Sequence, residues 1–102
     1  MDRIGLTGST GSLGKIIYKN KKNQKIFRFK GDIRNKSKVF KWIYKNDLKI
    51  IIHLAAIVPI KTVNENKKKA KEVNYLGTKN VVDASLKKKY KMVLFFFNIS
   101  RL

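Results

Sequence analysis

The sequence predicts an α/β protein with a parallel sheet covered by helices on both faces, and three observations support this fold class. Apolar runs alternate with amphipathic segments in the order β-α-β-α-β-α-β, without repeat or linker. The third apolar run is continuous, as is typical of a parallel strand buried on both faces. A glycine-rich turn joins the first run to the first amphipathic segment. With 102 residues, the chain suffices for one domain with a modest core.

Four strands are expected, and right-handed crossovers should join them. Their ranges are Arg3–Leu6, Lys25–Phe29, Lys49–Ala56 and Met92–Phe97. We expect the strand order 3-2-1-4, which leaves the last strand at an unprotected, apolar edge. Such an edge invites association, so we expect the chain to be marginally stable and to self-associate through this strand.

Three helices are expected between the strands, each with a capping residue and an apolar stripe. The expected caps are Ser12, Ser37 and, with capping-box spacing, Thr62 with Glu65. The stripes of the first two helices are Leu13, Ile16 and Ile17, then Val39, Phe40 and Ile43. The third stripe consists mostly of small residues, which let a helix lie close to a sheet: Ala70, Val73, Asn74, Gly77, Val81 and Ala84.

The net charge of +19 raises the question of a nucleic-acid partner. The basic residues are mainly lysines, scattered over every predicted helix face or helix end, where solvated lysine is ordinary. No interleaving of arginines with aromatic residues suggests base stacking. We therefore expect a solvated basic surface without a specific nucleic-acid partner. A basic stand-alone nucleic-acid-binding module remains the alternative.

Other compositional features narrow the class of protein. The chain has no cysteine, which excludes disulfides and cysteine zinc sites and fits a reducing cytosol; we expect no metal site. The apolar runs are too short to span a bilayer, so no membrane association is expected. The N-terminus does not resemble a signal peptide, and a cytoplasmic location is expected.

The glycine-rich turn, Leu6–Lys15, has the setting of a phosphate-binding turn because a strand precedes it and a helix follows. Its glycines, Gly8, Gly11 and Gly14, permit a tight turn, close approach of a ligand and close packing of helix on strand. The N-terminus of the helix would present N–H groups to a pyrophosphate. Asp32 follows about 20 residues later, where a dinucleotide fold contacts the ribose or adenine. The alternative is a turn that serves chain reversal only.

Four ordered segments, "TGSTGSLG", "GDIRN", "IIHLAA" and "VNYLGTKNVVDAS", resemble those of the extended short-chain dehydrogenases/reductases, the NAD-dependent epimerase/dehydratase family. The resemblance extends to about Phe97. Between the first helix and "GDIRN" there is one strand where many relatives have two, and this layout is similar to that of dTDP-4-dehydrorhamnose reductases. The resemblance implies that residues 1–102 are the NAD(P)-binding domain of a nucleotide-sugar reductase or epimerase, truncated before the catalytic and substrate-binding parts.

The resemblance also implies which residues contact the cofactor. They are Gly8, Thr10, Gly11, Ser12, Leu13, Gly14, Asp32, Ile33, Leu54, Ala55 and Ala56. The glycine turn would hold the pyrophosphate, the "DI" pair would border the adenine, and the segment after the third strand would line the cofactor. Asn74 would be a buried polar residue that ties the long helix to the sheet. The acidic Asp32 favours NAD, whereas Lys30 and Arg34 favour NADP; we expect either form, with a slight preference for NADP.

Catalytic residues are not expected in this chain. The resemblance places a Tyr-x-x-x-Lys pair after the fourth strand, and the sequence ends before such a pair is reached. Tyr75 and Lys79 have the spacing but lie in a helix where the family has no catalytic pair, and Ser100 is not expected to be catalytic. A nucleotide sugar would be the substrate of the full-length parent, and this chain would be inactive alone. His53 and Trp42 are expected to be core residues.

Overall fold

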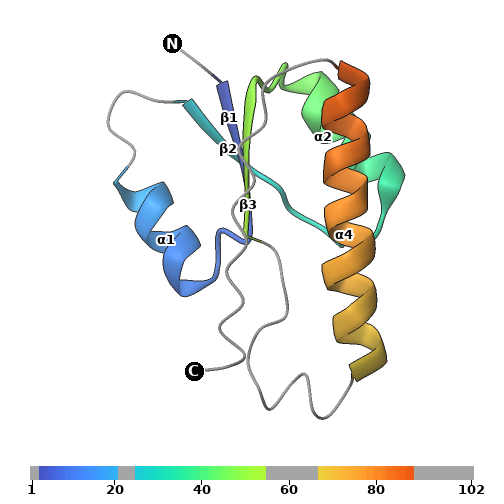
Figure 1. The fold of residues 1–102 in the computed structure, drawn as a ribbon. Coiled ribbons are helices and arrows are strands. Elements are labelled where there is room, and N and C mark those ends of the chain that lie inside the picture. The colour runs from blue at the N-terminus through green and yellow to red at the C-terminus, as the bar shows by residue number, and fades with distance from the viewer. Residues whose placement is uncertain (1–2, 21–24, 55–66, 89–102) are drawn as a thin grey trace.

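A computed structural model describes residues 3–20, 25–54 and 67–88 (Figure 1). The elements are β1 (Arg3–Thr7), α1 (Ser12–Lys19), β2 (Lys25–Arg28), α2 (Lys36–Lys45), β3 (Ile50–His53) and α4 (Lys67–Lys88). The expected fourth strand and the capping box of the third helix lie outside the described residues. The α/β class is confirmed, because each described strand is followed by a helix in the expected order.

The three described strands form one parallel sheet in the order β2-β1-β3. Ile4 of β1 lies opposite Ile26 of β2 and Ile50 of β3. The expected order was wrong in placing the third strand beside the second, since β3 pairs with β1. Two right-handed crossovers that run in opposite directions across a sheet place their helices on opposite faces. Accordingly α1 covers one face, whereas α2 and α4 cover the other (Figure 1).

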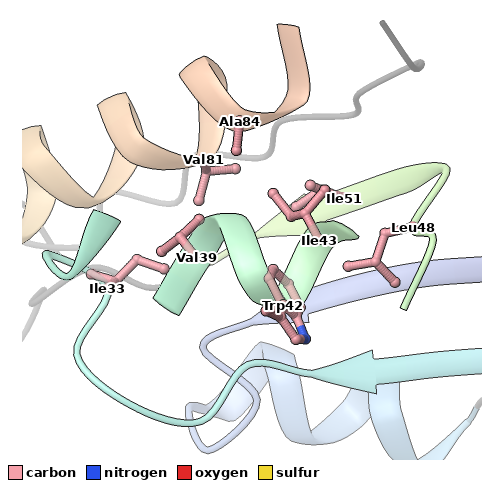
Figure 2. Close-up of a cluster of buried hydrophobic side chains, with 8 residues drawn as sticks. All are labelled: Ile33, Val39, Trp42, Ile43, Leu48, Ile51, Val81 and Ala84. Atoms are coloured by element: carbon pink, nitrogen blue, oxygen red, sulfur yellow. The ribbon is translucent and has the colours of Figure 1, made fainter. Parts of the chain in front are cut away.

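The hydrophobic core lies between the sheet and the pair of helices α2 and α4. Among the described residues, eight buried side chains form it: Ile33, Val39, Trp42, Ile43, Leu48, Ile51, Val81 and Ala84 (Figure 2). The indole of Trp42 also meets the ring of Phe29 edge-on, with 5.2 Å between centroids. The expectation that Trp42 is a packing residue is therefore confirmed.

Gly5 of β1 allows this core to pack close to the sheet. A Cβ on Gly5 would lie 2.5 Å from Leu48 Cδ1 and 2.8 Å from Trp42 Cη2. Any side chain there would displace one of these core residues, so core packing explains why this mid-strand position holds a glycine.

The expected serine caps were wrong, because both serines lie inside the helices. The N-cap of α1 is Gly11, which is extended with φ −74° and ψ 172° and offers no side chain. The N-cap of α2 is Asn35, whose Oδ1 accepts a hydrogen bond from the Lys38 N–H at 3.1 Å. Asn35 reaches the free N–H groups two residues before Ser37 does, so the helix begins earlier than expected.

Candidate functional site

The candidate site lies at the carboxyl ends of β1 and β3. From β1 the chain proceeds through α1 to β2 on one side, and from β2 it returns through α2 to β3 on the other side. In open α/β sheets, a crevice for ligands forms where the strand order reverses in this way. The glycine turn leaves β1 at this edge, and Leu54 follows β3 there (Figure 1).

Different physical constraints act at the three glycine positions of the turn. Gly8 adopts φ +72°, a conformation that favours glycine, and its carbonyl accepts a hydrogen bond from Gly11 N at 3.2 Å. Gly14 is buried, and a Cβ there would overlap Gly8 O and lie 2.8 Å from Ser9 Cα. A Cβ on Gly11 would lie 3.6 Å from Gly8 O, an ordinary contact. Conformation therefore requires glycine at position 8 and packing requires it at position 14, whereas position 11 has room for a methyl group.

The N-terminus of α1 is open at this edge. None of the described side chains caps the helix, and its first turn holds no acidic residue. Thr10, Gly11, Ser12 and Leu13 are all exposed. The first N–H groups of a helix lack intrahelical acceptors and carry partial positive charge. The described geometry therefore suits an anionic group of a ligand at this turn.

A buried hydrogen-bond network joins β1, β3 and α4 beside the turn. His53 is 2% exposed; its Nδ1 lies 2.7 Å from Thr7 Oγ1, and its Nε2 lies 3.1 Å from Thr78 Oγ1. Burial lowers the pKa of His53 to about 4, because the charged imidazolium loses its water. The expected core histidine is confirmed. Thr7 Oγ1 also accepts a hydrogen bond from Leu54 N at 3.0 Å, which fixes the backbone at the start of the segment expected to line the cofactor.

The loop between β2 and α2 carries an ion-paired carboxylate. Asp32 accepts hydrogen bonds from Arg34 Nη2 at 2.7 Å and from Arg34 Nε at 3.0 Å. These bonds lower the pKa of Asp32 to about 2, because they stabilise the ionised carboxylate. Arg34 Nη1 contacts Glu72 Oε2 of α4 at 3.2 Å. The salt bridge to Glu72 was not evident in the sequence, because its partners are 38 residues apart.

Two residues of α4 hold this loop against the helix. A Cβ on Gly77 would lie 2.5 Å from Ile33 Cγ2, so the absence of a side chain permits the contact. Asn80 is 7% exposed, and its Nδ2 donates to the carbonyls of Ile33 at 3.0 Å and Arg34 at 2.9 Å. Asn74 is only half-buried. Asn80 therefore ties α4 to this loop. The expectation that Asn74 is a buried residue that ties the helix to the sheet was wrong as to burial.

The sequence-predicted site residues gather at this edge as far as the structure describes them. Gly8, Ser12 and Gly14 belong to the turn, Asp32 and Ile33 to the next loop, and Leu54 is half-buried after β3. Ala55, Ala56 and Ser100 lie outside the described residues.

Tyr75 and Lys79 lie on the exposed surface of α4. Tyr75 is 68% exposed, and Lys79 Nζ pairs with Asp83 at 2.7 Å. Over residues 3–20, 25–54 and 67–88, no cluster of histidine and acidic side chains suits a metal ion. None of the helices in these ranges is long and apolar enough to cross a membrane.

A parallel sheet in the order β2-β1-β3, with a glycine turn that enters a helix at the switch point, defines an incomplete Rossmann-type domain. Residues 9–100 match the model of the 3-beta hydroxysteroid dehydrogenase/isomerase family. The chain therefore belongs to this family, which is one of the epimerase/dehydratase-type short-chain dehydrogenases/reductases. The comparison with curated proteins found no match.

Solved structures with similar folds include sugar-nucleotide enzymes. A dTDP-4-dehydrorhamnose reductase from Bacillus anthracis, solved with NADP, has TM-score 0.82 and 29% identity over 90% of this chain and 35% of its own. The ortholog from Clostridium acetobutylicum has TM-score 0.78 and 26% identity over 88% and 34%. A UDP-glucose 4-epimerase from Thermus thermophilus, solved with NAD, shares the fold at TM-score 0.74 with 19% identity over 88% and 36%. The chain thus spans about a third of each of these proteins.

Proposed function

We propose that residues 1–102 form the NAD(P)-binding part of a sugar-nucleotide reductase or epimerase similar to dTDP-4-dehydrorhamnose reductase. The observation that carries the proposal is the glycine turn at the switch point. Gly14 packs under Gly8 O, so the turn closes tightly at the open N-terminus of α1. The similarity to a reductase solved with NADP supports this reading.

Each region of the edge would contact one part of the dinucleotide. The N–H groups at the start of α1, from Ser12 to Gly14, would bind the pyrophosphate. Ile33, held by Gly77 and Asn80, would give the adenine a fixed apolar wall. Leu54, with Ala55 and Ala56 after it, would line the cofactor beyond β3. When bound, the nicotinamide would supply hydride transfer, which no side chain can perform.

We further propose that residues 1–102 bind the cofactor without turning over a nucleotide sugar. The family resemblance places the catalytic Tyr-x-x-x-Lys pair after the fourth expected strand. In α4, Tyr75 has this spacing, but its partner Lys79 is ion-paired with Asp83 and Tyr75 is exposed on the surface of the helix.

The excess positive charge supports only non-specific attraction to polyanions. Exposed lysines occur on α1, α2 and α4, and these helices cover both faces of the sheet. Dispersed charge of this kind attracts nucleic acid without reading a base sequence. We therefore propose no specific nucleic-acid partner for this chain.

The fluorescence of NADPH and NADH, titrated with the 102-residue chain, tests the cofactor proposal. We expect saturable binding that Gly14→Ala weakens by at least about tenfold, because the added methyl group displaces Gly8 O and opens the turn. Ile16→Ala is the control on the same helix and should bind within about threefold of the wild type, since this side chain is 58% exposed and lies outside the glycine turn.

Two results would contradict the proposal. The first is a folded wild-type chain that binds neither nucleotide. The second is equal weakening by the two alanine variants, which would mean that the turn does not bind the cofactor through its packed form.

A further inference from the structure

Arg34 and Lys38 both carry positive charge beside the β2–α2 loop, and their surroundings differ. Arg34 Nε and Nη2 contact the carboxylate of Asp32, and its Nη1 contacts Glu72. Both oxygens of Asp32 are likewise engaged by Arg34. In the sequence, Asp32 favours NAD and Arg34 favours NADP. In the structure, the charges of these two residues largely neutralise each other.

Lys38 lies over the same loop from the first turn of α2. A Cβ on Gly31 would lie 3.4 Å from Lys38 Cδ and 3.6 Å from Lys38 Nζ. The cap on Asn35 holds the backbone of Lys38 in place through its N–H. The ammonium group is thus brought to the open backbone of Gly31, which has φ +132° and no side chain.

The described carboxylates leave Lys38 without an acidic partner. In residues 3–20, 25–54 and 67–88 they are Asp32, Asp47, Glu72 and Asp83, which pair with Arg34, Lys49, Lys79 or Lys88. Lys69 of α4 lies near enough to Asp32 to add to the positive potential there. The surroundings of Gly31 therefore favour an additional anionic group.

We propose that Lys38 binds the 2′-phosphate of NADP at Gly31, and that this contact makes the site prefer NADP to NAD. The inference rests on the proposed function, because the pyrophosphate at α1 directs the adenosine ribose toward the carboxyl end of β2. Gly31 lets the phosphate approach the backbone closely, since no Cβ stands in the way. Lys38 then acts as a point charge on the phosphate, while Arg34 only orders the loop.

Two nucleotides that differ by one phosphate test the contact: adenosine 2′,5′-bisphosphate and adenosine 5′-monophosphate. Calorimetric titration should show that the wild-type chain binds the bisphosphate about tenfold more tightly. Lys38→Gln should abolish this preference and leave the affinity for the monophosphate unchanged. Lys45→Gln is the matched control: it removes the same charge from an exposed residue of α2 that lies about two helical turns beyond Lys38, and it should keep the preference.

The possible results separate this inference from the proposed function. Equal affinity of the wild-type chain for the two probes would overturn the Lys38 contact and leave the dinucleotide site intact. Loss of the preference in Arg34→Gln but not in Lys38→Gln would also overturn it, because Arg34 would then be the phosphate ligand. Binding of none of the probes, nor of NADPH or NADH, would overturn both proposals.

Discussion

The two faces of the sheet differ in how much they bury. On one face, α2 and α4 interlock with the sheet in a core that includes Val39, Ile43 and Val81 (Figure 2). On the other face, α1 buries only Gly14 completely, and Ile16 remains 58% exposed. The closely packed contact of α1 is thus made by backbone, where Gly14 meets Gly8.

This difference separates stability from binding. Burial of apolar side chains is the dominant favourable term in folding, so the α2 and α4 face should carry most of the stability of the described residues. The α1 face contributes an ordered glycine turn and an open helix end, which serve a ligand. Substitutions on the two faces should therefore have effects of different size and kind.

The largest expected effect tests this separation directly. Trp42→Ala should lower the free energy of unfolding by about 3–5 kcal/mol, because it removes a large buried side chain from the core. Ile16→Ala on α1 should change it by no more than about 0.5 kcal/mol, because this side chain is mostly in water. Urea titration followed by circular dichroism measures both values. Similar losses in the two variants would show that the faces contribute equally.

Trp42→Phe refines the same comparison. The Nε1 of Trp42 is buried and makes no hydrogen bond with the described residues. Phenylalanine removes this unsatisfied donor and keeps an aromatic ring in the core. We therefore expect a much smaller loss of stability than for Trp42→Ala, because removal of the unsatisfied donor partly offsets the cost of the cavity.

The core face was the more predictable from the sequence. Periodicity identified Val39, Ile43, Gly77, Val81 and Ala84, because apolar and small residues at helical spacing mark a buried stripe. The same rule failed for α1, because it predicted that Leu13 and Ile16 pack against the sheet, and both side chains are exposed. An eight-residue helix held by a glycine contact does not need a continuous apolar face.

Polar ties and strand order were not predictable from local pattern. Asn80 lies three residues after Gly77, on the same helix face, but periodicity ranks apolar residues and does not reveal which asparagine is buried. The position of β3 beside β1 depends on the direction of a crossover, which the order of elements alone leaves open. In contrast, the glycine turn was predictable, because conformation and packing restrict Gly8 and Gly14 to one residue type.

The second-largest expected effect is a change of stability with pH, caused by His53 where β1, β3 and α4 meet. The folded chain holds the pKa of His53 at about 4, whereas the unfolded chain takes up the proton near 6.5. Between these values the unfolded state binds more protons, so stability should fall as the pH falls, by roughly 3 kcal/mol in total. Asp32 has a pKa of about 2 and loses its stabilising charge only at lower pH. His53, rather than Asp32, therefore controls the change in stability between pH 6.5 and pH 4.

Urea titrations at several pH values measure this slope. His53→Gln provides the control, because glutamine does not titrate and can form hydrogen bonds with Thr7 and Thr78. The variant should show little change in stability between pH 6.5 and pH 4. An equal slope in the wild type and the variant would contradict the assignment to His53.

The smallest expected effect concerns Asn80, which connects α4 to the β2–α2 loop of the proposed site. Asn80→Leu keeps the branched shape of the side chain but leaves the carbonyls of Ile33 and Arg34 without this donor, which should cost about 2 kcal/mol of stability. Asn74→Leu should cost less, because Asn74 is only half-buried. The Asn80 variant should also weaken nucleotide binding, since the loop that would border the adenine loses its attachment to α4. If Asn80→Leu lowered stability as expected and left nucleotide affinity unchanged, α4 would stabilise the fold without ordering the site.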